Sequence, residues 1–136
     1  MPRLHIKRSY RTAHRAFLVC AGLVGSQAAA DVVIGPGVLD AVESGRARIV
    51  VELRLPGGFH AEGGLTQERV QAQREAIAES QTSVLSALAA EDARLVRRPT
   101  TVPFLALEVG PQALAKLRTM PEQIARVLED QTAAAQ

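Results

Sequence analysis

The chain has 136 residues, enough for one domain, with 16 lysine and arginine residues against 14 acidic ones. All 14 acids lie after residue 30, so residues 31–136 combine 11 basic with 14 acidic residues and carry a net charge of −3. The basic balance of the whole chain therefore belongs to its first segment and does not indicate a nucleic-acid surface. Cys20 is the only cysteine, which excludes disulfides and thiolate metal sites from residues 31–136.

Residues 1–30 have the three-part order of a secretory signal peptide. Five basic residues precede the apolar run Ala16–Val24, and an Ala-x-Ala site at Ala28–Ala30 comes directly before Asp31. The run is too short to span a bilayer, and Cys20 lies inside it rather than after it, which argues against lipidation. We predict cleavage near Ala30, a secreted or periplasmic protein, and no stable membrane association afterwards. The alternative is a buried N-terminal helix.

Residues 31–45 form a lead-in segment with a short helix that Pro36 begins and Gly45 closes. Residues 46–55 then alternate between apolar and polar or smaller side chains, which predicts a half-buried strand. Its predicted inner face is Ile49, Val51, Leu53 and Leu55. A loop with four glycines follows over residues 56–64.

Thr66 is a suitable N-cap for a long helix that extends to about Ala90, with Glu68 in its first turn. The predicted apolar stripe of this helix contains Val70, Ile77, Val84 and Leu88. Beyond it the pattern predicts strands over residues 93–98, 104–109 and 124–130. A short helix that starts at Gly110-Pro111 separates the last two strands.

This order predicts an α+β, ferredoxin-like βαββαβ domain over residues 46–136: a four-stranded antiparallel sheet with two helices on one face. The other face of the sheet is then left uncovered. It is either a binding surface or an ordinary face towards water, and the pattern alone does not decide between them. The side chains predicted on this face are Val50, Glu52, Phe104, Ala106 and Glu108.

Residues 31–136 contain no catalytic or cofactor motif. His60 is their only histidine, and one histidine without cysteine does not make a zinc site. There is neither a nucleophile elbow nor a glycine loop with the lysine that phosphate binding needs. RNA binding on such a sheet needs several aromatic side chains, and Phe104 is nearly alone. The chain also lacks the asparagine of an acylphosphatase-type site. We predict a non-enzymatic binding module without metal, cofactor or nucleic-acid partner.

Four stretches in order carry a resemblance to a known family: "RIVVEL", "REAIAESQTSVLSAL", "PFLALEV" and "ALAKLRTMPEQIARVLEDQ". Over about residues 47–136 the chain resembles the propeptide domain of subtilisin-like serine proteases, the propeptide-type peptidase inhibitor family. The resemblance implies the βαββαβ fold and a subtilisin-like serine protease as partner. It also implies that the open sheet face docks on two surface helices of that protease.

The resemblance implies two further roles near the C-terminus. Glu129 and Asp130 match the acids that lie by the N-termini of the protease helices, where carboxylates are favourable. The tail would lie extended along the active-site cleft like a cleaved product, with Ala133 four residues before the cut and Gln136 beside the nucleophile. The tail consists of Gln131, Thr132, Ala133, Ala134, Ala135 and Gln136.

Two departures from the family pattern bear on function. No catalytic domain with Asp, His and Ser motifs follows the tail, and Gln136 stands where a large apolar or aromatic residue is more usual. The chain is thus either a stand-alone inhibitor or a propeptide separated from its protease, able also to assist protease folding.

The Arg97-Arg98 pair is either a processing site or a charged strand end. The alternative function is a non-catalytic ferredoxin-like regulatory domain that pairs with itself through the open sheet.

Overall fold

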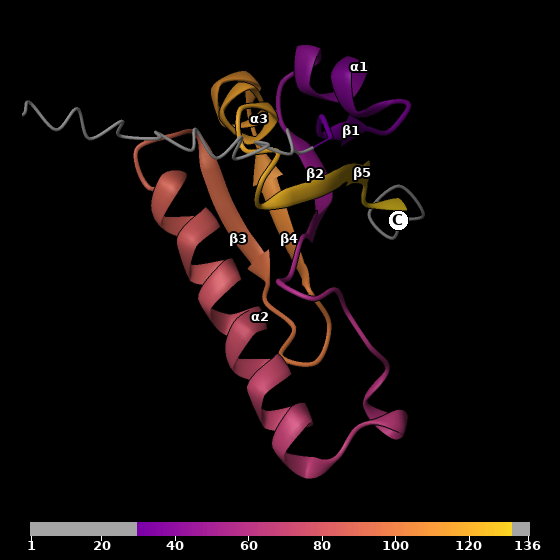
Figure 1. Cartoon of the computed structure of the whole chain (residues 1–136). Coiled ribbons are helices and arrows are strands. Elements are labelled where there is room, and N and C mark those ends of the chain that lie inside the picture. The colour runs from indigo at the N-terminus through magenta and orange to yellow at the C-terminus, as the bar shows by residue number, and fades with distance from the viewer. Residues whose placement is uncertain (1–29, 132–136) are drawn as a thin grey trace, which may run out of the picture.

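The computed structural model describes residues 30–131; residues 1–29, which are all but the last residue of the predicted signal peptide, and tail residues 132–136 lie outside this range. The described chain is an α+β domain with one five-stranded mixed sheet and three α-helices (Figure 1). The strands are β1 (Val33–Ile34), β2 (Ala47–Leu53), β3 (Ala93–Arg97), β4 (Phe104–Val109) and β5 (Ile124–Glu129). The helices are α1 (Val38–Glu43), α2 (Gln67–Ala87) and α3 (Pro111–Arg118).

The prediction of a four-stranded antiparallel sheet is wrong by one strand. The four predicted strands are present and pair antiparallel in the order β5-β2-β4-β3. The lead-in segment adds β1, which pairs in parallel with β5 through Val33 and Ile34. The sheet is therefore mixed and has five strands. A two-residue strand is too short to produce a hydrophobic period, so the sequence pattern did not reveal it.

The alternation of β2 places one row of its side chains, Ile49, Val51 and Leu53, in the core, as predicted. Leu55, by contrast, lies beyond the end of the strand and is only half-buried. Ile49 and Val51 are fully buried and lie opposite Leu107 and Leu105 of β4. Buried side chains of all three helices, including Val38 of α1, belong to the same core cluster. The helices therefore pack on one face of the sheet, and the pairing register is fixed because a shift of one residue would expose this row.

A buried amide ties α2 to the connection between β3 and β4. Gln81 is 1% exposed, and its amide nitrogen donates hydrogen bonds to the carbonyl oxygens of Pro99 (2.7 Å) and Phe104 (2.9 Å). The amide oxygen of Gln81 accepts from Nε of Arg98 at 2.8 Å. Arg98 also donates to the carbonyl oxygen of Ala78 at 2.8 Å, so it lies against α2 just beyond the end of β3.

Asp92 caps α3 from a distant part of the chain. The helix has no side-chain cap of its own, and Pro111 occupies its first turn. Oδ1 of Asp92 accepts a hydrogen bond from the backbone nitrogen of Ala113 at 2.7 Å, as an N-cap carboxylate would. A methyl group at Gly110 would overlap this carboxylate, so the close approach requires glycine there.

We predict that Gln81→Leu lowers the free energy of unfolding by about 2–3 kcal/mol, because the carbonyl oxygens of Pro99 and Phe104 lose their donor. Urea unfolding followed by circular dichroism measures this change. Gln71→Leu is the matched control, since Gln71 is an exposed α2 residue that bonds only Glu75 among the described residues. It should change stability by no more than about 0.5 kcal/mol. Equal effects of the two substitutions would contradict the assigned role of Gln81.

Candidate docking face of the sheet

The five side chains predicted on the uncovered face lie together in the structure. Val50 of β2 pairs with Ala106 of β4, and Glu52 pairs with Phe104. Glu108 follows on the same face of β4, two residues after Ala106. We call this surface of β2, β4 and β5, opposite the helices, the open face.

Strand β5 extends the open face with two residues that the sequence analysis did not include. Leu128 pairs with Val50, and Arg126 pairs with Glu52. Leu128 is 37% exposed, which makes it one of the more exposed large apolar side chains of the described chain. The alternation of "IARVLE" around the buried Val127 contained the signal that would have found both residues.

Two hollows meet at Val50. The first has a volume of about 310 Å³ and is bounded by Val50, Phe104 and Ala106 together with the β3–β4 connection. The second has a volume of about 460 Å³ and extends from Val50 and Leu128 to Gln131, where the tail begins. An apolar strip thus crosses the open face and ends beside the tail.

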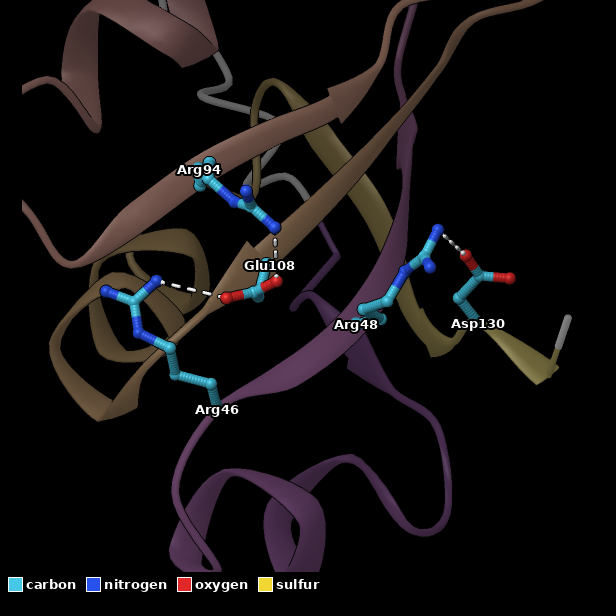
Figure 2. A network of polar contacts seen from close by, with 5 residues as sticks. All are labelled: Arg46, Arg48, Arg94, Glu108 and Asp130. Carbon is cyan, nitrogen blue, oxygen red and sulfur yellow. Dashed lines mark hydrogen bonds and ion pairs between the residues drawn. The ribbon is translucent and has the colours of Figure 1, made fainter. Parts of the chain in front are cut away.

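Arginines neutralise both glutamates of the open face. The carboxylate of Glu108 lies between the guanidinium groups of Arg94 (2.9 Å) and Arg46 (3.4 Å), as Figure 2 shows. The carboxylate of Glu52 accepts from Nε of Arg126 at 2.6 Å. The hydrogen bond from Arg94 holds the pKa of Glu108 below its usual range, partial desolvation opposes it, and the Arg94 and Arg46 charges reinforce the lowering.

The structure separates the two acids that the resemblance grouped. Asp130 is 7% exposed on the open-face side of the sheet, where its carboxylate lies 3.4 Å from the guanidinium of Arg48 (Figure 2). Its backbone nitrogen also donates to the carbonyl oxygen of Arg48. Glu129 pairs with the core residue Ile49, and its carboxylate lies beside Gly37 at the start of α1. Neighbouring strand residues point to opposite faces, so the Asp130 side chain points to the docking side, while Glu129 only borders the second hollow.

Of the predicted tail, the structure describes one residue. Gln131 is exposed and contributes to the second hollow. The other tail residues, Thr132, Ala133, Ala134, Ala135 and Gln136, lie outside the described range. The tail role predicted for them rests on the sequence.

Positive charge gathers on the open face. Five arginines lie on it or reach it, against three acids, an excess of two positive charges on a segment whose net charge is −3. The arginines are Arg46, Arg48, Arg94, Arg97 and Arg126, and the acids are Glu52, Glu108 and Asp130. Such an asymmetry favours a partner surface that carries negative charge.

Two other site types are not found in residues 30–131. No group of three or more histidine, cysteine, aspartate or glutamate side chains in this range is placed to hold a metal ion. None of the helices described there combines the length and the apolar character needed to cross a membrane.

We predict that Glu108→Gln lowers stability at neutral pH and that its deficit shrinks in acid. The pKa of Glu108 is lowered in the folded state, so its contribution is complete above the unfolded pKa of about 4.3 and is lost as pH falls through the folded value. Urea midpoints at neutral pH and at about pH 3 test this. Glu122→Gln removes an exposed carboxylate from the turn after α3 and serves as control. A pH-independent deficit for Glu108→Gln would contradict the ionic role.

Comparison with known proteins gives no information on function. No family model, no curated protein and no solved structure matches the chain.

Proposed function

We propose that this chain is an exported inhibitor of a subtilisin-like serine protease, which docks through its open face and blocks the active-site cleft with its C-terminal tail. One observation carries the proposal most directly. The second hollow runs from Val50 and Leu128 on the open face to Gln131, so a partner bound on that face has the tail beside it. The sequence resemblance to propeptide-type inhibitors supports the same arrangement.

The topology supports a finer assignment of the fold. We propose a ferredoxin-like βαββαβ core from β2 to β5, to which β1 and α1 are added at the N-terminal side. The strand order β5-β2-β4-β3, with antiparallel pairs throughout this core, is the basis for the assignment. The additional β1 lies beyond β5 and leaves the open face of β2 and β4 unchanged.

In the proposed mechanism nothing is chemically transformed. The tail pairs with the cleft edges by main-chain hydrogen bonds, which the small side chains Ala133 to Ala135 permit. The carboxylate of Gln136 would take the place of an acyl product near the oxyanion donors. Ordering six tail residues costs roughly 1–2 kcal/mol each, so the open face must supply most of the anchoring. The same docking would allow the chain to assist folding of the protease.

Asp130 is the acid that the proposal assigns to the N-terminus of a partner helix. It lies on the docking side, whereas the Glu129 carboxylate lies by α1. The carboxylate of Asp130 is 7% exposed and pairs with the half-exposed Arg48 at 3.4 Å, so a helix end that docks here would share it with Arg48.

The second candidate is a regulatory domain that pairs with itself through the open face. The observation in its favour is exposed apolar surface on the open face, where Leu128 is 37% exposed. Edge strands and apolar sheet faces are common places for two copies to associate. This candidate requires a dimer in solution and makes no use of the tail.

We predict that the full chain inhibits a subtilisin-type protease, and that ending the chain at Asp130 removes about 3 kcal/mol of binding, a weakening of about a hundredfold. Steady-state inhibition constants measure this. A peptide of residues 127–136 should inhibit far less than the full chain, because it lacks the open face. Equal potency of the peptide and the full chain would contradict the claim that the open face supplies most of the binding. If the chain does not inhibit the protease, and if it forms a dimer both with and without the tail, the self-pairing candidate would be favoured.

We predict that Leu128→Glu weakens inhibition about tenfold or more, because it places a charge in the apolar strip of the docking face. Leu39→Glu is the matched control, since Leu39 is 48% exposed on α1 and does not contribute to either hollow of the open face. Both variants should keep the far-ultraviolet circular dichroism of the parent chain. A loss of inhibition that is the same for both would argue against docking through the open face.

A further inference from the structure

A second, separate surface is formed where the glycine-rich loop lies against α2. Two pairs of contacts hold the loop to the helix. The side-chain amide of Gln73 donates to the carbonyl oxygen of His60 and accepts from its backbone nitrogen, both at 2.9 Å. The guanidinium of Arg74 donates to both carboxylate oxygens of Glu62, at 2.8 and 2.7 Å. These contacts hold the loop at a defined distance from α2.

A hollow of about 320 Å³ lies between the loop and the helix. The side of α2 that faces it carries Arg69, Ala72, Gln73 and Ala76, which are spaced three, four and seven residues apart and so share one helix face. Ala72 and Ala76 are small, and this leaves the space open. Leu55 and Leu65 form apolar walls on the loop side, so the surface is mainly aliphatic.

One full positive charge borders this aliphatic surface. Arg69 lines the hollow, and within residues 30–131 its guanidinium makes no ion pair or hydrogen bond. Arg74, five residues further along α2, is already paired with Glu62 and is not part of the lining. A single guanidinium beside aliphatic walls matches a monoanion with an apolar chain better than it matches a phosphate dianion, which needs more donors.

We propose that this hollow binds a small aliphatic carboxylate. The carboxylate pairs with Arg69 and the alkyl chain lies against Leu55, Leu65 and Ala72. The volume corresponds to about ten water-sized groups, roughly the size of octanoate. None of the residues that form the open face lines this hollow, and the inference does not depend on the proposed inhibitor function.

The test titrates the full ¹⁵N-labelled chain with sodium octanoate and follows the backbone amide signals. Saturable shifts are expected at residues 55–58 and 65–76. Acetate supplies the charge without the chain, and 1-octanol supplies the chain without the charge. Each should bind at least about fivefold more weakly than octanoate. Absence of saturable octanoate shifts near the hollow would overturn the proposal.

Two pairs of variants test separately how the charge of Arg69 and the space of the hollow contribute to octanoate binding. Arg69→Gln should weaken octanoate binding about fivefold, while Arg118→Gln, which removes an exposed arginine of α3, should leave it unchanged. Ala72→Leu fills the hollow and should abolish binding, while Ala78→Leu adds the same bulk at an exposed α2 position outside its lining. Octanoate binding that Arg69→Gln or Ala72→Leu leaves intact would overturn the assignment.

Discussion

The pairing of β2 on both of its edges is the constraint on which the other features depend. Its register with β4 and β5 places Ile49 and Val51 in the core and Val50 and Glu52 on the open face. Because strand side chains alternate, the same seven residues fix both the surface that the helices cover and the surface that they leave uncovered. Core packing and the candidate docking face are therefore two results of a single register.

Much of the fold was predictable because its signals are local. The alternation of residues 46–55 and the Thr66 cap are visible in short windows, and the structure confirms a strand at Ala47–Leu53 and a helix that Thr66 caps. The missed features depend on residues far apart in the sequence. Strand β1 exists because β5 lies beside it, and the burial of Gln81 depends on carbonyl groups 18 and 23 residues further along. No short window contains such partners.

The features of the candidate site also fall into those that local sequence predicts and those that depend on distant residues. The open-face positions followed from period-two alternation, and the separation of Glu129 from Asp130 could have followed from the same rule. The arginine partners of Glu52 and Glu108 could not, because Arg126 and Arg94 come from other strands. These partners change the character of the face, since its carboxylates are held within the chain and its excess charge is positive. A face of this kind suits a partner surface that combines apolar groups with acidic side chains. A sheet face that binds RNA would instead present several aromatic side chains.

The cap on α3 has a consequence for the cooperativity of folding. An eight-residue helix is too short to persist by itself in water, and this one receives its capping carboxylate from Asp92, 21 residues before Ala113. The carboxylate reaches the helix only when the turn after α2 and the β3–β4 hairpin are in place. The β4-α3-β5 unit therefore receives its helix cap from the turn between α2 and β3, so that it and the β2-α2-β3 unit form in one cooperative transition rather than as independent units.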